Sequence, residues 1–254
     1  MCSVLLSLKV VTNHWAPPLL SFSRSKDFSK SQVEFVSRRR IAASSNHPIA
    51  MSGDRKLPVL LFDVMDTLVR DPFYHDVPAF FRMEFQQLIS EKHPTSWLEF
   101  ENGLIDEVEF GESFFKDGRH VDIEGLKGCM QDGYQYLDGM KALLHNLKQE
   151  NYEIHAFTNY PIWYTMIEDK LKLSAYLSWT FCSCNLGKRK PAPEIFKEVS
   201  HLLDVDPRNC IFVDDRMENI NAARKAGMVG LHFKNAASLQ HDLSMHSIDI
   251  HDTL

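Results

Sequence analysis

The stretch VLLFDVMDTLV, residues 59–69, decides the fold because an apolar run ends abruptly in acidic residues. Residues 59–62 are apolar without alternation, which is typical of a strand in a parallel sheet that is covered on both faces. Asp63 would then lie at the carboxyl end of that strand, where open α/β sheets bind their ligands. On this stretch alone a plainer interpretation stays open, in which Asp63 caps the following turn and Asp66 begins the next one.

Length and composition place the chain among ordinary globular proteins. Its 254 residues, 44% apolar and 24% charged, suffice for an α/β domain with a smaller insert. No apolar run approaches the roughly 20 residues of a membrane span, and a net charge of −6 without a dominant basic face argues against a nucleic-acid partner. The five cysteines form no Cys-x-x-Cys pair, which argues against a zinc site and a disulfide scaffold. Nothing in the sequence indicates the oligomeric state.

The first 50 residues differ in composition from the rest of the chain. They hold seven Lys and Arg residues and ten Ser, but only two acids, Asp27 and Glu34. A basic, Ser-rich and acid-poor leader is typical of an organellar transit peptide, and the Ser content favours plastids over mitochondria. We therefore expect residues 1–50 to be a disordered transit peptide and the mature protein to lie in the plastid (chloroplast) stroma. A basic tail without a targeting role is the alternative.

The order of the expected elements predicts a doubly wound sheet. After residues 59–62, strands are expected at residues 152–159, 178–183, 209–213 and 229–233, with helices between them at 163–171, 192–203 and 217–227. This alternation indicates a Rossmann-like α/β core with a parallel sheet, built from residues 57–69 and 138–235. The tail, residues 236–254, carries no pattern that we can interpret.

The first two strands are separated by roughly 90 residues, which is too long for a simple crossover. Residues 70–137 are therefore expected to form an insert, and their pattern is helical. Residues 77–89 place apolar side chains on one face of a single helix, with Pro78 in its first turn. Further amphipathic pieces span residues 96–102, 106–115 and 122–134. The sequence thus predicts a small helical cap inserted into the core.

Polar side chains end three of the expected strands. Asp63 follows the first strand, Thr158 and Asn159 end the second, and Asp214 and Asp215 follow the fourth. Because the carboxyl ends of parallel strands meet at one edge of a sheet, these groups are expected to converge. Converging carboxylates repel one another unless a cation lies among them, and hard oxygen ligands suit Mg²⁺. The sequence therefore predicts a magnesium site at this edge.

Lys190, just before a helix that begins with proline, adds a fixed positive charge. A carboxylate nucleophile, a divalent metal, a lysine and hydroxyl donors together point to phosphoryl transfer through an aspartyl-phosphate. Four landmarks now stand in order: FDVMDTL, FTN, a Lys-Pro before a helix, and VDDRMENINAARKAG. In these landmarks the sequence resembles the haloacid dehalogenase superfamily of phosphohydrolases over residues 57–233. The resemblance implies a Mg²⁺-dependent phosphatase whose insert is a helical cap over the substrate.

The resemblance also assigns roles on the phosphate side of the site. Asp63 corresponds to the nucleophile, which is also a direct metal ligand. Thr158 corresponds to the hydroxyl that binds the transferring phosphoryl group, with Asn159 beside it. Lys190 corresponds to the lysine that steadies the nucleophile and the phosphate.

On the metal side, Asp215 corresponds best to the family's metal-binding carboxylate, because Asn219 occupies the place where many members have a further acid. Asp214 is then expected to be bonded towards Lys190 or a metal-bound water. At Met65 the family uses the backbone carbonyl as a ligand, which this residue retains.

The pattern departs from the family at Met65. Family phosphatases have a second aspartate there, which protonates the leaving oxygen and then activates water, a contribution of roughly 10²–10⁴ in rate. Three interpretations stay open: a slow phosphatase in which Asp66, water or the substrate supplies the proton; a protein that binds a phosphorylated ligand or partner with little turnover; and a 2-haloacid dehalogenase, which needs no acid because halide leaves unprotonated.

Aromatic residues are frequent in the insert, and Phe73 and Tyr74 lie just past the nucleophile loop. A cap that closes on a flat phosphorylated metabolite would use such residues. The leader, the opening DVMDTLVRDPFY and the stretch WLEFENGLIDEVEF are similar to those of the plant plastid flavin mononucleotide (FMN) hydrolases of this superfamily. This similarity implies hydrolysis of FMN to riboflavin and phosphate, within riboflavin metabolism. Another small phosphometabolite is the alternative substrate.

Overall fold

A five-stranded parallel sheet forms the centre of the described chain, residues 55–248 of this computed structural model. The sheet order is β3-β2-β1-β4-β5, and the strands are β1 (Val59–Phe62), β2 (Ile154–Thr158), β3 (Ser178–Cys182), β4 (Cys210–Asp214) and β5 (Val229–His232). The expected doubly wound α/β core is confirmed. The leader expected over residues 1–50 lies outside the described residues.

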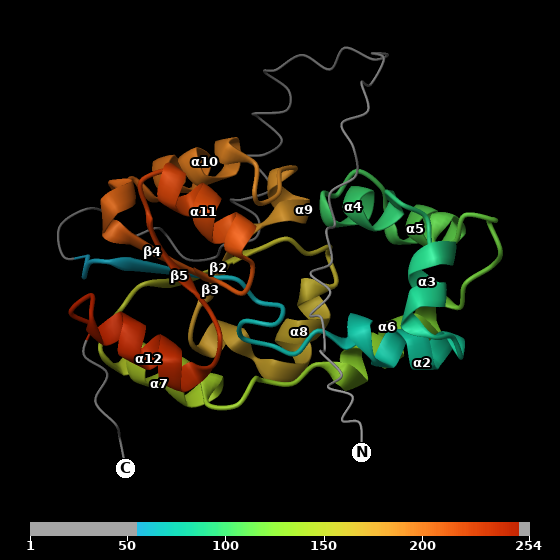
Figure 1. Cartoon of the computed structure of the whole chain (residues 1–254), viewed down its shortest axis with the longest axis horizontal. Coiled ribbons are helices and arrows are strands. Elements are labelled where there is room, and N and C mark those ends of the chain that lie inside the picture. Colours follow the sequence, from blue (N-terminus) through green and yellow to red (C-terminus); the bar gives the residue numbers. More distant parts are fainter. Residues whose placement is uncertain (1–54, 249–254) are drawn as a thin grey trace, which may run out of the picture.

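Helices cover both faces of the sheet, as Figure 1 shows. One layer contains α10 (Pro193–Leu203) and α11 (Met217–Lys225); the other contains α7 (Met140–Gln149), α8 (Tyr164–Leu171) and α12 (Ala236–Ser244). Within β1, Val59 and Leu61 pack into the first layer and Leu60 and Phe62 into the second, because successive side chains of a strand point to opposite faces. All four are fully buried, which accounts for the apolar run without alternation.

The strand order places a crevice beside β1. From β1 the chain moves outward to β2 and β3, then returns to the other side of β1 for β4 and β5. The direction of winding therefore reverses between β1 and β4. Open α/β sheets bind ligands at such a switch point, outside the carboxyl ends of the strands.

The insert forms a group of short helices at one end of the sheet (Figure 1). It contains the 3-10 turn η1 (Pro72–Tyr74) and the helices α2 (Asp76–Phe81), α3 (Phe85–Glu91), α4 (Ser96–Glu101), α5 (Glu107–Ser113) and α6 (Ile123–Gly133). The helices expected at 96–102, 106–115 and 122–134 are confirmed within one or two residues. Asp106 and Asp122 cap α5 and α6 with their side chains, which fixes where these helices begin.

The single helix expected over residues 77–89 is wrong, since α2 and α3 are separate helices. Arg82 has a left-handed backbone (φ 54°) and its amide bonds to the Ala79 oxygen at 3.0 Å, while the Met83 amide bonds to the Pro78 oxygen at 2.9 Å. These contacts close α2 in the manner of a C-terminal cap. The apolar periodicity runs through the break because both helices face the same small core.

The two segments that join the cap to the core are hydrogen-bonded to each other. The Arg70 amide donates to the Gln135 oxygen, and the Leu137 amide donates to the Leu68 oxygen, each at 2.9 Å. Val69 and Tyr136 form an antiparallel bridge between them. The chain therefore enters and leaves the cap through a paired linker, residues 68–70 and 135–137.

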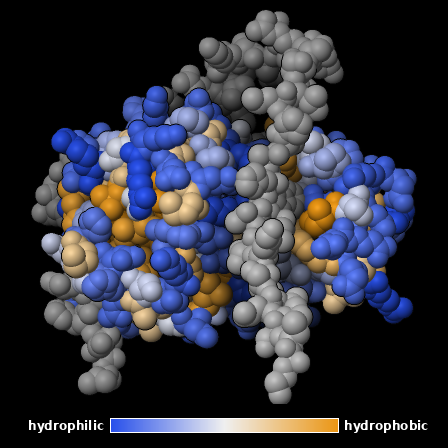
Figure 2. All heavy atoms as spheres, viewed as in Figure 1, coloured by the Kyte–Doolittle hydropathy of each residue, from blue (hydrophilic) through white to orange (hydrophobic). Residues whose placement is uncertain are grey.

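Residues after Lys234 include one further helix, α12, which we did not predict from the sequence. Leu239 and Leu243 are buried and pack beside α7. Hydrophilic side chains cover most of the described part of the face in Figure 2, with apolar residues in smaller patches over core and cap. No helix within residues 55–248 is both long and apolar enough to cross a membrane.

Leu61 offers a direct test of the role of β1 in stability. Leu61→Ala removes a fully buried side chain between the sheet and its helices, so we expect a loss of about 2–5 kcal/mol in the free energy of unfolding. Leu104→Ala, the same change at a position 69% exposed, should cost less than about 0.5 kcal/mol. Denaturant unfolding of both variants measures the difference; equal losses would contradict the packing described here.

Candidate active site

Three carboxylates meet at the carboxyl ends of β1 and β4. One oxygen from each of Asp63, Asp214 and Asp215 lies within 4.8 Å of the others. The Asp63 amide donates to the Val213 oxygen at 2.9 Å, which continues the pairing of β1 with β4 and so brings the acids side by side. Asp214 is fully buried and Asp63 is 8% exposed. The expected convergence of these acids is what the structure shows.

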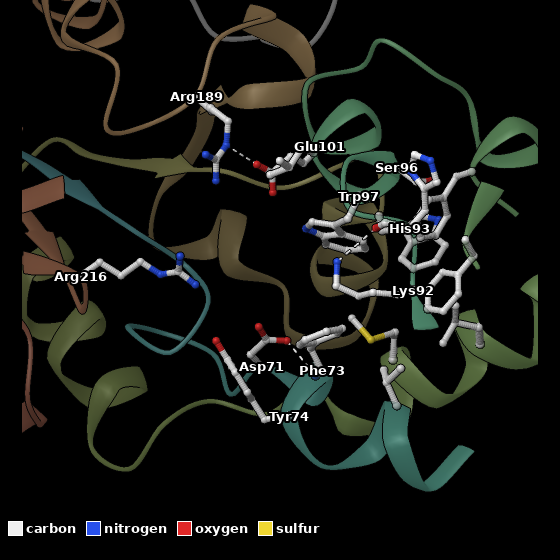
Figure 3. A pocket seen from close by; sticks show the side chains of 17 residues that line it. Asp71, Phe73, Tyr74, Lys92, His93, Ser96, Trp97, Glu101, Arg189 and Arg216 are labelled. Atoms are coloured by element: carbon white, nitrogen blue, oxygen red, sulfur yellow. Dashed lines mark hydrogen bonds and ion pairs between the residues drawn. The ribbon is translucent and has the colours of Figure 1, made fainter. Parts of the chain in front are cut away.

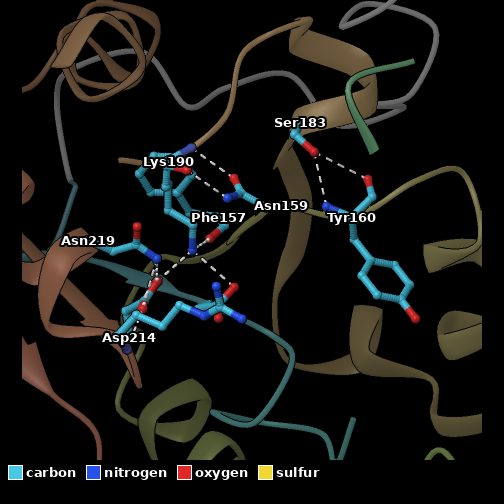
Figure 4. A network of polar contacts seen from close by, with 9 residues as sticks. Phe157, Asn159, Tyr160, Ser183, Lys190, Asp214 and Asn219 are labelled. Carbon is cyan, nitrogen blue, oxygen red and sulfur yellow. Dashed lines mark hydrogen bonds and ion pairs between the residues drawn. The ribbon is translucent and has the colours of Figure 1, made fainter. Parts of the chain in front are cut away.

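Lys190 lies among these carboxylates (Figure 4). Its ammonium nitrogen is 3.0 Å from Asp63 Oδ1 and 2.7 Å from Asp214 Oδ2, and it also donates to the Phe157 oxygen at 2.6 Å. Burial alone would lower the pKa of Lys190, but the Asp214 and Asp63 carboxylates outweigh it and raise the pKa. The lysine therefore stays charged at neutral pH.

Asn159 holds Lys190 in place through the backbone. Its Oδ1 accepts a hydrogen bond from the Lys190 amide and its Nδ2 donates to the Lys190 oxygen, both at 2.8 Å. Asn159 also lines the cavity above the carboxylates. Both polar atoms of its side chain are thus engaged in fixing the lysine.

Asp214 and Asp215 differ in their hydrogen bonds. Asp214 accepts from Lys190, from the Arg216 amide at 2.8 Å and from Asn219 Nδ2 at 3.0 Å on each oxygen. None of the described residues donates to the Asp215 carboxylate. Its oxygens are therefore available to a ligand.

The donor set fits a hard divalent cation. Burial raises the pKa of Asp215 to about 8, and the negative charges of Asp63 and Asp214 add to the shift. Burial also raises the pKa of Asp63, against the opposing effect of Lys190. Buried carboxylates that repel one another gain most from a bound cation, and oxygen ligands beside an open cavity suit Mg²⁺. Met65 lines the same cavity.

Thr158 ends β2 with a buried hydroxyl. Its Oγ1 has no hydrogen-bond partner within residues 55–248, and buried polar atoms without a partner are uncommon in proteins. Thr158 lines neither of the two cavities described here, so its contact with a ligand stays a prediction.

Asp66 occupies a turn position. It has a left-handed backbone (φ 54°), its amide donates to the Val69 oxygen at 2.7 Å, and its Oδ1 accepts from the Asp71 amide at 2.9 Å. Burial raises the pKa of Asp66. The carboxylate lines the cavity of the acids, but one of its oxygens is committed to the loop that follows.

An aromatic cavity adjoins the cavity of the acids, and five residues line both: Asp71, Trp97, Glu101, Arg189 and Arg216. Six aromatic residues line the aromatic cavity: Phe73, Tyr74, Trp97, Phe110, Phe114 and Trp163. Its polar lining includes Lys92, His93 and Ser96 from the cap (Figure 3). Phe73 and Tyr74 line the aromatic cavity and not the cavity of the acids, so their contact with a substrate stays a prediction.

Polar contacts hold the cap to the core at the edge of these cavities. Arg189 forms an ion pair with Glu101 of α4, and the Ser183 hydroxyl donates to the Glu101 backbone oxygen. Trp163 Nε1 donates to Glu107 of α5 at 2.6 Å. The structure thus has the cap closed over the acids.

Sequence reasoning missed several of these residues. Asp71 lies three residues past the landmark FDVMDTL, and Arg216 lies inside the landmark VDDRMENINAARKAG, so position near a strand end was an available signal for both. Lys92 is different, because it lies at the end of α3 in the cap and belongs to no motif. Only its burial, with 7% of its surface exposed, distinguishes it. Burial of a lysine is a property of the fold and has no local sequence signal.

Comparison with known proteins gives consistent results. The haloacid dehalogenase-like hydrolase family matches residues 15–227. The chain is 63% identical over 200 residues to flavin mononucleotide hydrolase 1 of the Arabidopsis thaliana chloroplast, covering 79% of this chain and 82% of that protein. It is 27% identical over 209 residues to the glyceraldehyde 3-phosphate phosphatase of Pyrococcus furiosus, covering 74% and 85%.

Among solved structures, a haloacid dehalogenase family enzyme of Bacteroides thetaiotaomicron, in complex with magnesium and inorganic phosphate, superposes with a TM-score of 0.60. The match covers 71% of this chain and 96% of that one at 23% identity. At this identity the likeness concerns the fold.

The raised pKa of Asp215 predicts how the metal-free protein responds to pH. In EDTA, the folded state holds a proton on Asp215 that the unfolded state releases, so stability should fall as the pH rises from 3.8 towards 8. Asp215→Asn should flatten this fall. Mg²⁺ added at pH 8 should raise the unfolding temperature of the native chain and raise that of the variant less. Equal effects of Mg²⁺ on both would remove Asp215 from the metal site.

Proposed function

The chain belongs to the haloacid dehalogenase-like hydrolases, and we propose that it is a Mg²⁺-dependent phosphatase that hydrolyses FMN to riboflavin and inorganic phosphate. The observation that supports FMN as the substrate is the 63% identity to a relative named as an FMN hydrolase. The chemistry is supported by the cluster of Asp63, Asp214 and Asp215 with Lys190 among them.

In this proposal Asp63 is the nucleophile. Lys190 lies 3.0 Å from its Oδ1 and fixes the carboxylate at the edge of the cavity, where it attacks phosphorus in line with the leaving oxygen. An aspartyl-phosphate on Asp63 forms, and water then hydrolyses it. Lys190 and the Thr158 hydroxyl bind the oxygens of the transferring phosphoryl group, and Asn159 positions Lys190.

Asp63, Asp215 and the Met65 backbone oxygen would hold the metal, which when bound neutralises charge on the phosphate and the carboxylates. Asp214 has all its oxygens bonded to protein donors, so it orients Lys190 and supports the site without needing to touch the ion. Asp214 is thus bonded to protein groups, whereas Asp63 and Asp215 face the ligand.

The aromatic cavity would receive the isoalloxazine ring of FMN. It begins at residues shared with the acid cavity, so a phosphate on Asp63 and a ring between Tyr74 and Trp97 can belong to one molecule. Lys92 lies on the cap side of this cavity, where burial lowers its pKa to about 8. Flavin carries carbonyl oxygens at one end of an otherwise apolar ring system, and an ammonium group is a fitting donor for them.

The proposed location is the chloroplast, and the proposed partner is the small-molecule substrate. Two observations support the location: the 63% identical relative is named as a chloroplast protein, and residues 1–50 have a basic, Ser-rich composition. The leader itself lies outside the described residues.

Phosphate release from FMN tests the proposal directly. Native protein should release phosphate and riboflavin with Mg²⁺ and neither with EDTA, and Asp63→Asn should abolish release because the amide cannot attack phosphorus. A panel of sugar, nucleotide and triose phosphates ranks the substrates. Preference for another monoester would change the substrate and keep the chemistry; no release from any of them would favour a protein that only binds its phosphorylated ligand.

Lys92→Met tests the placement of the ring. Loss of the donor should raise KM for FMN by about tenfold, which corresponds to one hydrogen bond to a charged group. The kinetics with p-nitrophenyl phosphate should be unchanged, since Lys92 lines only the aromatic cavity and that substrate is too short to reach it. Lys116→Met, an exposed lysine of the same cap, is the matched control. Equal changes for both substrates would place the ring elsewhere.

A further inference from the structure

The proposed reaction lacks a proton donor at the usual position. The leaving group in FMN hydrolysis is a primary alcohol of the ribityl chain, which departs poorly as an alkoxide, so protonation of the leaving oxygen accelerates the step. Met65 faces the same cavity as Asp63 but has no exchangeable proton on its side chain. Another group near the phosphate therefore has to supply the proton for the leaving oxygen.

Asp66 is the nearest acid in sequence, yet its geometry serves the loop. Its Oδ1 is bonded to the Asp71 amide at 2.9 Å and its backbone is left-handed, as a turn requires. Moving this carboxylate towards the phosphate would break that bond and release the start of the next segment. The Asp66 carboxylate therefore acts as a fixed anchor for Asp71.

Asp71 is placed at the junction of the two cavities. It lines both the cavity that contains Asp63 and the aromatic cavity, so it borders the place where the phosphate of a bound FMN joins its organic part. Figure 3 shows it between Arg216 of the core and the aromatic residues of the cap. Its Oδ1 accepts from the Phe73 amide at 2.9 Å, which orients the carboxyl group. Its Oδ2 accepts no hydrogen bond from the described residues.

The surroundings of Asp71 favour a carboxyl group that can change protonation state near neutral pH. Burial raises the pKa of Asp71 to about 7 despite the opposing hydrogen bond from Phe73, and the facing charges are Asp66 and Asp63, which raise it, and Arg216, which lowers it. Three phenols also lie near it, those of Tyr74, Tyr134 and Tyr160, and burial raises the pKa of each. Glu101 and Arg189, which form an ion pair with each other, line the same two cavities as Asp71, and Lys92 and His93 line the aromatic one. An acid–base group works best when its pKa is close to the working pH.

We propose that Asp71 is the acid–base residue of this site, in the place of the aspartate that Met65 lacks. The inference rests on the proposed phosphatase function. As the bond between phosphorus and the ribityl oxygen breaks, the Asp71 carboxyl donates its proton to that oxygen and riboflavin leaves as the alcohol. Asp71, now a carboxylate, takes a proton from water as the water oxygen attacks phosphorus, which returns Asp63 as a carboxylate and releases phosphate.

Asp71→Asn separates this role from a structural one. Asp and Asn cap helices about equally well, so a capping role for the Phe73 amide predicts little change. Proton transfer predicts that kcat for FMN falls roughly 10²–10⁴-fold, with KM and unfolding temperature close to native. The fall of native activity above pH 7 should also be absent from the variant. Asp122→Asn, the same change at the exposed cap of α6, is the matched control.

Two further measurements sharpen the result. p-Nitrophenyl phosphate has a leaving group that needs no proton, so Asp71→Asn should show a burst of nitrophenol equal to the enzyme concentration and then stall as the aspartyl-phosphate. Met65→Asp added to Asp71→Asn should recover turnover, because it returns an acid to the same cavity.

Either of two outcomes would overturn the assignment. One is native-like turnover of FMN by Asp71→Asn, and the other is a larger loss of kcat in Asp66→Asn than in Asp71→Asn. If the native protein prefers another monoester, the FMN proposal fails while the same variants decide the role of Asp71 on that substrate. If it hydrolyses none, both proposals fail.

Discussion

The buried ammonium of Lys190 is the interaction on which the site depends. It lies 3.0 Å from Asp63 and 2.7 Å from Asp214 at 1% exposure. A charge buried this deeply needs partners, and leaving it or either acid alone would be costly. The three groups therefore fix one another's positions, and through the Asn159 side chain they also fix the end of β2 against the start of α10. The sheet edge is rigid before any ligand arrives.

The fold follows closely from the sequence because its signals are local. The unbroken apolar run of β1 and the alternation of strands and helices predicted the parallel sheet, and the amphipathic pattern predicted α4, α5 and α6 of the cap. The break at Arg82 was missed because a left-handed arginine leaves no trace in hydrophobic periodicity. Helix α12 was missed because only two buried leucines on its inner face distinguish it from a polar tail.

The candidate site also contains some residues that could be predicted from the sequence and others that could not. Acids at strand ends could be predicted because the topology of a parallel sheet brings those ends together, whatever the rest of the chain does. Lys92 and Asp71 could not, since their importance comes from what the folded cap places around them. Asp71 precedes η1 as its N-cap, an ordinary role for an aspartate, and only its place between the two adjoining cavities suggests a chemical role.

The paired linker between core and cap has a consequence for Asp71. The chain enters and leaves the cap at one place, through two segments that are hydrogen-bonded to each other. Asp71 is the first residue past residues 68–70 of this linker, and its amide is bonded to the Asp66 carboxylate on the core side. The proposed proton donor is thus tied to the nucleophile loop, so its placement relative to Asp63 depends on this short loop more than on the cap helices beyond it.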